Sequence, residues 1–134
     1  MTQAHVEALE GGFAAYAKGD FAGMLTLFAP DAVCRRWPPL PDPGTYRGPA
    51  GFAELVNDWI KGFKDFETGV NEYIDVDEEQ VISRVFQRAV GAESGARVDA
   101  EFWFVWRLED SAVKRLDIYM TEEQARDAAR SHER

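Results

Sequence analysis

The spacing of apolar side chains predicts helices in the first half of the chain. Apolar residues recur every three or four positions over residues 3–18, which indicates an amphipathic helix. Asp20 is a suitable cap for a shorter second helix, and we expect Pro30 to end it, because proline disfavours a helical conformation in the preceding residue. A third helix is predicted over residues 49–63, starting at a proline that suits a first helical turn.

The apolar period then changes to two, which is typical of strands. Residues 66–76, 80–90, 97–108 and 112–120 predict four strands, and their short connections favour antiparallel pairing. One face of the first strand is expected to carry Phe66, Thr68, Val70, Glu72, Ile74 and Val76. One face of the third is expected to carry Phe102, Phe104, Trp106 and Leu108.

The end of the chain predicts one more helix. Thr121 and Gln124 have the spacing of a capping box, and the helix is expected to end near Arg130. No repeat, linker or low-complexity segment interrupts the sequence. We therefore predict one α+β domain over residues 1–134.

Composition and charge narrow the possible partners. The chain is 46% hydrophobic and 29% charged, as in globular proteins, and lacks both a signal peptide and the roughly 20-residue apolar run of a membrane span. We expect it to be cytoplasmic. Its net charge of −9 opposes binding to nucleic acid or to anionic membrane surfaces.

The sequence contains few residues that bind metals or cofactors. Cys34 is the only cysteine, so neither an intrachain disulfide nor a thiolate cluster is expected, and we interpret it as a small buried hydrophobe. The two histidines, His5 and His132, lie near opposite ends of the chain. No glycine-rich phosphate loop is present, so we predict neither a metal nor a cofactor.

The segment AVCRRWPPLPDPGTYRG, residues 32–48, carries two adjacent arginines. Arg36 shares strand parity with Cys34 and is predicted to point inward, whereas Arg35 points away. Arg36 is expected either to contact a ligand or to have a structural role. In the structural role it would extend to the mouth of a pocket or pair with an acid. The prolines are expected to hold the following connection extended as a pocket rim, with Trp37 as part of a lid.

Glu72 is a carboxylate on an otherwise apolar strand face. Burial would raise its pKa and a nearby arginine would lower it again. A pair of Glu72 and Arg36 would therefore be either a tuned catalytic acid and base or a structural ion pair.

Five further residues are candidates for contacting a ligand. Tyr16 either lends a hydroxyl or belongs to the core, and Gln87 either orients a carbonyl or lies at the rim. Trp59, Phe104 and Trp106 are core residues that would also form an aromatic wall for a flat ligand.

Three segments support a family resemblance. YAKGDFAGMLTLFAPDAV, YRGPAGFAELVNDWIKGF and FVWRLEDSAVKRLDIYMTEEQA closely resemble the nuclear transport factor 2-like superfamily and, within it, the SnoaL-like branch that includes polyketide cyclases. The resemblance covers residues 4–129. It implies a cone, in which three N-terminal helices pack on a curved, mostly antiparallel sheet around an internal pocket. It also implies a homodimer formed through the outer sheet face.

The catalytic positions of two relatives are vacant here. Ketosteroid isomerases in this superfamily place a base and two donors at positions that correspond to Arg36, Gly12 and Phe104. Positions used by limonene-type epoxide hydrolases correspond to Val85, Gln87 and Ile118. A cation at the position of the isomerase base favours recognition of an anion or carbonyl over proton abstraction.

Two functions remain open. The first is an enzyme or binder of the SnoaL-like type, acting on a hydrophobic, oxygenated ligand such as a polyketide or terpenoid, as a cyclase, isomerase or hydrolase. The second is a non-catalytic homodimeric module for ligand binding or protein interaction. Its interface would be an outer face carrying Trp103, Val105 and Tyr119 interleaved with Asp99, Glu101, Arg107 and Asp117.

Overall fold

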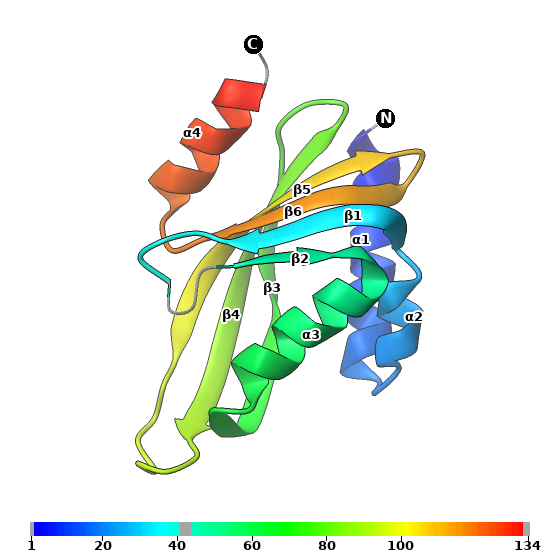
Figure 1. The fold of residues 1–134 in the computed structure, drawn as a ribbon. Coiled ribbons are helices and arrows are strands. Elements are labelled where there is room, and N and C mark those ends of the chain that lie inside the picture. Colours follow the sequence, from blue (N-terminus) through cyan, green and yellow to red (C-terminus); the bar gives the residue numbers. More distant parts are fainter. Residues whose placement is uncertain (1, 41–43, 133–134) are drawn as a thin grey trace.

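The computed structural model describes residues 2–40 and 44–132 and consists of four helices and one six-stranded sheet (Figure 1). The helices are α1 (Thr2–Ala17), α2 (Phe21–Leu25), α3 (Gly48–Ile60) and α4 (Glu122–His132). The strands are β1 (Phe28–Arg36), β2 (Thr45–Arg47), β3 (Phe63–Asp75), β4 (Gln80–Gly91), β5 (Ala100–Glu109) and β6 (Ala112–Tyr119). The predicted rim falls partly on residues 41–43, which lie outside the described residues.

The strand order is β2-β1-β6-β5-β4-β3, and only β1 and β6 pair in parallel. The curved sheet lies against α1, α2 and α3 on its inner face, while α4 packs on the outer face (Figure 1). This arrangement confirms the predicted α+β cone with a short C-terminal helix. The capping contacts of Asp20 and Thr121 are also present, to the backbone N–H groups of Gly23 and Gln124.

The second helix is shorter than predicted. It ends at Leu25 rather than at Pro30, and Pro30 lies within β1. The register between β1 and β6 shifts between Phe28 and Val33, and a strand tolerates proline at such an irregularity. The third helix also ends earlier than predicted, at Ile60, and the three-residue strand β2 was not predicted.

The alternation along β3 changes at one point, and this overturns the prediction for Glu72. Val70 pairs with Val85, but Glu72 pairs with the adjacent Arg84, so β3 has an extra residue at Asn71. Such a bulge moves all later side chains to the opposite face. Residues up to Val70 keep the predicted face, whereas Glu72, like Ile74, lies on the outer one.

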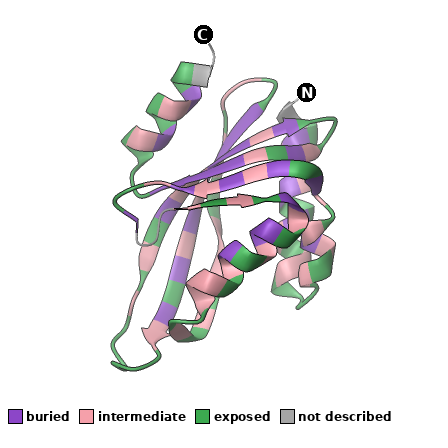
Figure 2. Cartoon of the chain, viewed as in Figure 1, coloured by how far each residue is buried: buried purple, intermediate pink, exposed green. Residues whose placement is uncertain are grey.

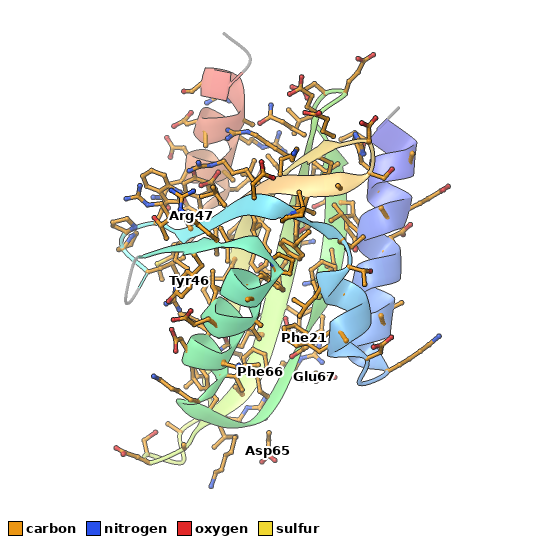
Figure 3. All side chains as sticks on the ribbon, turned by 45° about the vertical axis from the view of Figure 1, so that its right-hand side comes forward. Phe21, Tyr46, Arg47, Asp65, Phe66 and Glu67 are labelled. Carbon is orange, nitrogen blue, oxygen red and sulfur yellow. The ribbon has the colours of Figure 1, made fainter. Side chains whose placement is uncertain are left out.

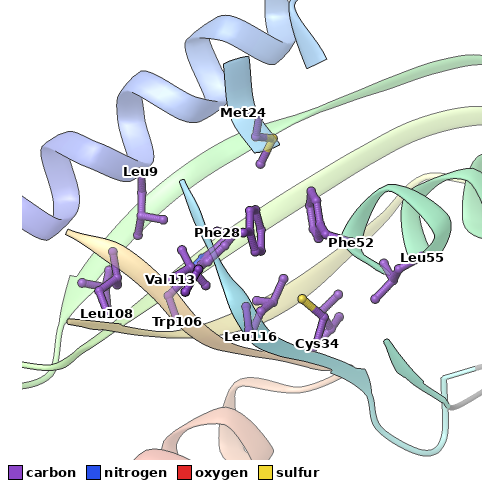
Figure 4. Packing of buried hydrophobic residues seen from close by; sticks show 14 of the residues in the cluster. Leu9, Met24, Phe28, Cys34, Phe52, Leu55, Trp106, Leu108, Val113 and Leu116 are labelled. Atoms are coloured by element: carbon purple, nitrogen blue, oxygen red, sulfur yellow. The ribbon is translucent and has the colours of Figure 1, made fainter. Parts of the chain in front are cut away.

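Two hydrophobic clusters hold the layers together. The larger lies between the inner face and the first three helices, around Trp106 and Leu9 (Figure 4). The smaller lies under α4, where the helix residue Ala125 packs with the sheet residues Val105 and Tyr119. Figure 2 shows buried positions both on α4 and on the strands of the sheet. The predicted exposure of Val105 and Tyr119 as interface residues is therefore wrong for the single chain, because α4 buries both.

Two glycines let α3 approach the sheet closely. Gly48 has a φ of 72°, and a Cβ there would lie 2.9 Å from the carbonyl oxygen of Pro30. A Cβ on Gly51 would lie 3.0 Å from a backbone carbon of Tyr46. This close packing brings one turn of α3 next to the inner side of β2.

Candidate functional site

An internal cavity lies between the first three helices and the inner face of the sheet. It offers about 90 Å³ to the centres of water-sized molecules, within about 730 Å³ of empty space that includes its open mouth. The larger volume counts solvent outside the mouth, so the smaller one describes the interior. Since one water needs about 10–15 Å³ of such space, the interior has room for a small organic molecule.

The cavity wall is predominantly apolar. Its aromatic side chains are Phe13, Tyr16, Phe21, Phe52, Trp59, Phe66, Phe102 and Phe104. Figure 3 labels Phe21 on α2 and Phe66 on β3, which approach the cavity from different elements. Among the described residues, neither a carboxylate nor a histidine lines the wall. The lining therefore favours an apolar ligand with flat rings.

Arg36 is the charged residue that lines this cavity. Its side chain points inward, as predicted, and the residue is only 3% exposed. One terminal nitrogen donates a hydrogen bond to the Tyr46 hydroxyl at 3.0 Å, and the guanidinium carbon lies 5.6 Å from the ring centroid of Trp59. The buried Nε has no hydrogen-bond partner among the described residues, and no described carboxylate lies within 4.0 Å of the guanidinium.

A short chain of hydrogen bonds connects Arg36 to the surface. The Tyr46 hydroxyl donates to Oδ2 of Asp58 at 3.1 Å, and Asp58 forms an exposed ion pair with Lys61 at 3.7 Å. Burial and the bond to Asp58 raise the pKa of Tyr46, while the nearby Arg36 partly offsets the rise. Asp58 thus supports the buried cation through Tyr46 and not by direct contact. The sequence did not identify either residue, because a three-residue strand has too few positions to show alternation.

Gln87 lines the cavity, but its amide is already bonded. Its Oε1 accepts from Nε1 of Trp59 at 2.7 Å, and its Nε2 donates to the Val98 carbonyl at 3.1 Å. The Thr68 hydroxyl is likewise bonded, to the Phe86 carbonyl at 2.7 Å. Gln87 therefore positions Trp59, with one bond at each end of its amide.

The other predicted contact residues divide between the cavity and the core. Tyr16 and Phe104 line the cavity, and burial raises the pKa of the Tyr16 hydroxyl. Trp106 is fully buried beside the cavity without lining it, and its Nε1 donates to the Ser83 hydroxyl at 2.9 Å. The structure therefore places Trp106 in the core and not in the predicted aromatic wall.

Trp37 lies on the outer face, contrary to its predicted place in a lid. Its ring stacks on Tyr119 at 5.9 Å between centroids, and its Nε1 donates to Asp117 at 2.8 Å. Leu40, three residues later, does line the cavity. The chain crosses from one face to the other within this connection, which residue parity in the strand cannot foresee.

Glu72 and Arg36 do not form the predicted pair. The Glu72 side chain is 53% exposed and contacts Arg84 at 3.4 Å, and Arg84 contacts Glu101 at 2.7 Å. The bulge in β3 is the physical reason, since it moves Glu72 to the outer face. Cys34 is buried on the inner side, where loss of hydration, followed by the charge of Asp117, raises the pKa of its thiol to about 12.

The described residues contain neither a cluster of metal-binding side chains nor a helix that could span a membrane. They contain no group of three or more histidine, cysteine, aspartate or glutamate side chains that could hold a metal ion. None of the helices in the described ranges is long and apolar enough to cross a membrane.

Comparison with known proteins agrees with this geometry. The family model of the SnoaL-like domain matches residues 9–116. A search of curated proteins finds no match.

Several solved structures share the fold. An NTF2-like protein from Burkholderia thailandensis is 17% identical, with a TM-score of 0.77 over 91% of this chain and 96% of that one. TerC, co-crystallised with polyporic acid, is 17% identical, with a TM-score of 0.75 over 95% and 98%. AclR from Streptomyces galilaeus, described as a putative hydroxylase, is 17% identical, with a TM-score of 0.67 over 95% and 96%. At such identities the similarity establishes the fold alone.

Proposed function

The chain belongs to the SnoaL-like domain family, and from this premise we propose that it binds a hydrophobic, oxygenated small molecule in the cavity between helices and sheet. Polyketide-like and terpenoid-like compounds have the required combination of apolar rings and a few oxygen atoms. The aromatic wall would cover the rings, and Arg36 would bind one oxygen.

The observation that carries this proposal is the buried guanidinium of Arg36. A buried charge is costly unless it is paired, yet within the part of the chain that the structure describes Arg36 bonds a neutral hydroxyl and its Nε has no partner. Hydrogen bonds from a charged donor to a carboxylate, enolate or polarised carbonyl are about twice as strong as neutral ones. A ligand oxygen placed against Arg36 would supply the missing acceptor.

The same geometry limits the chemistry that the cavity can perform. The described lining residues include neither a carboxylate nor a histidine, so they supply no general base. Arg36 instead suits stabilisation of negative charge that develops on a ligand oxygen, which would assist a cyclisation or isomerisation. Binding without turnover remains the alternative, and both outcomes require the same contact with Arg36.

Calorimetry with matched probes tests the proposal. We expect 1-naphthoate to bind more tightly than 1-naphthalenemethanol, which has the same rings without the charge. In Arg36→Met the preference for the acid should fall about tenfold or more, since a charged hydrogen bond is lost. Arg97→Met is the matched control, because it removes the same charge at an exposed pair with Asp99, outside the cavity wall. Equal preference for the acid in wild type and Arg36→Met would refute the role of Arg36.

We also propose that the chain forms a homodimer through its outer sheet face. Beyond α4 this face carries Phe86 with the Arg88 guanidinium 4.6 Å from its ring centroid, beside the ion pair of Arg84 and Glu101. Such mixed aromatic and charged surfaces are common at interfaces. Sedimentation equilibrium at micromolar concentration should give twice the chain mass of 15.1 kDa. A particle of the chain mass would contradict the dimer.

A further inference from the structure

The outer face carries a group of arginines that the cavity does not use. Arg107 on β5 lies directly opposite Arg115 on β6. Arg115 and Arg47 in turn both pair with Val33, because β1 lies between β6 and β2. Figure 3 labels Arg47 on β2, next to Tyr46, whose side chain bonds Arg36 on the inner side. With Arg35 on β1, these residues form an arginine cluster: Arg35, Arg47, Arg107 and Arg115.

One buried carboxylate lies in this cluster. Asp117 accepts hydrogen bonds from Arg115 at 2.8 and 3.0 Å and from Nε1 of Trp37 at 2.8 Å, and its side chain is 3% exposed. Arg107 approaches it more loosely, at 3.7 Å. Both carboxylate oxygens are therefore occupied, mainly by Arg115 and Trp37.

The other three arginines are paired less completely than Arg115. The guanidinium of Arg35 stacks on the Trp37 ring at 3.8 Å, and Nε of Arg107 donates to the neutral amide oxygen of Gln80 at 3.2 Å. Among the described residues, no carboxylate lies within 4.0 Å of Arg35 or Arg47.

Such an excess of positive charge requires an explanation. Like charges directly opposite each other on neighbouring strands destabilise a sheet, and Arg107 and Arg115 have this relation. The chain as a whole has a net charge of −9, so a surplus of cations in one place runs against its composition. Stacking on Trp37 and bonding to Gln80 and Asp117 also hold three of the guanidiniums in place before any ligand arrives.

We propose that the arginine cluster binds the anionic group, a carboxylate or a phosphate, of a small ligand at a site separate from the cavity. Planar guanidinium groups match both oxyanions with paired hydrogen bonds. Arg35 and Arg47 supply donors that no described carboxylate occupies, Arg107 is held by Gln80 and loosely by Asp117, and Arg115 is fixed by Asp117. The site does not depend on the ligand proposed for the cavity, because Arg36 points to the other face.

Calorimetric titration at constant ionic strength tests the site, with inorganic pyrophosphate as the phosphate probe and citrate as the carboxylate probe. We expect the full chain to bind at least one of them, and the tighter probe identifies the preferred oxyanion. Arg107→Gln and Arg35→Gln should each weaken its binding about tenfold. Arg97→Gln is the matched control, since it makes the same charge change at an exposed pair with Asp99, at the end of the β4–β5 pair opposite Arg107.

Three results would overturn the proposal: no binding of either probe by the wild type, unchanged binding in both cluster variants, or an equal loss in Arg97→Gln. Arg35 makes no ion pair within the described residues, so Arg35→Gln keeps the test valid even if Arg107→Gln unfolds. Arg36→Met should still bind the probe, which separates this site from the cavity.

Discussion

Arg36 and Asp117 are buried charges on opposite faces of neighbouring strands, and their surroundings differ. Asp117 has a guanidinium and an indole N–H on its two oxygens, whereas among the described residues the Arg36 side chain bonds one neutral hydroxyl and its Nε has no partner. Both residues are nearly inaccessible, at 2% and 3% exposure. A buried charge whose hydrogen-bond partners are complete therefore stabilises the fold, whereas a buried charge that lacks a partner and faces a cavity is suited to binding a ligand.

The largest effect is expected from Asp117→Asn. This change leaves Arg115 and Arg107 without their carboxylate in a buried setting, and breaking a buried pair costs about 3–5 kcal/mol. Urea unfolding should show this loss in the free energy of unfolding. Arg36→Met should change the same quantity by less than about 1 kcal/mol, since an apolar side chain replaces a poorly paired charge. Similar losses of stability in Asp117→Asn and Arg36→Met would contradict this distinction between the two buried charges.

A smaller loss of stability is expected at alkaline pH, because burial on the inner face disfavours the thiolate form of Cys34. Its pKa rises from 9.0 to about 12 in the folded chain, so folding favours the protonated thiol. The stability that this thiol contributes is complete below pH 9 and falls as the pH rises towards 12. Between pH 8 and 10.5, the wild type should lose about 2 kcal/mol more than Cys34→Ala. Parallel pH profiles would show that the thiol ionises freely when folded.

Gln87→Leu should cost about 1–3 kcal/mol, because the indole N–H of Trp59 and the Val98 carbonyl lose their partner. If Gln87 positions Trp59, the affinity for 1-naphthoate and for 1-naphthalenemethanol should fall together. A selective loss of affinity for one probe would instead indicate direct contact with the ligand. Calorimetry on both probes, beside urea unfolding, distinguishes these outcomes.

The smallest effect is expected from Glu72→Gln. The carboxylate is 53% exposed, and exposed ion pairs contribute about 0–1 kcal/mol. Stability and probe binding should both remain within error of the wild type. A marked loss of probe affinity would mean that Glu72 reaches the cavity, and would restore the two-residue site that the sequence suggested.

The success and failure of the sequence predictions have one physical origin. Counting parity from Ala32 placed Arg36 correctly, because β1 has no irregularity between Val33 and Arg36. The same count failed for Glu72, because the extra residue at Asn71 reverses the faces and leaves no trace in the alternation of apolar residues. The individual elements were predictable because helix and strand periods extend over many residues, whereas their arrangement in a cone was implied by the family resemblance.

Partners from other elements could not be predicted in this way. Tyr46 comes from a three-residue strand and Asp58 from an exposed helical turn, and only tertiary packing brings them to Arg36. The covering of Val105 by α4 depends likewise on where the terminal helix folds back. Sequence periodicity describes the face of an element, but not what packs against it.

A crystal structure of the chain with bound 1-naphthoate tests the central claim most directly, because it shows which arginine receives the acid. We expect the rings to lie against the aromatic wall and a carboxylate oxygen to lie about 3 Å from the Arg36 guanidinium. A carboxylate bound only by Arg35 and Arg107 on the outer face, with the cavity empty, would contradict it.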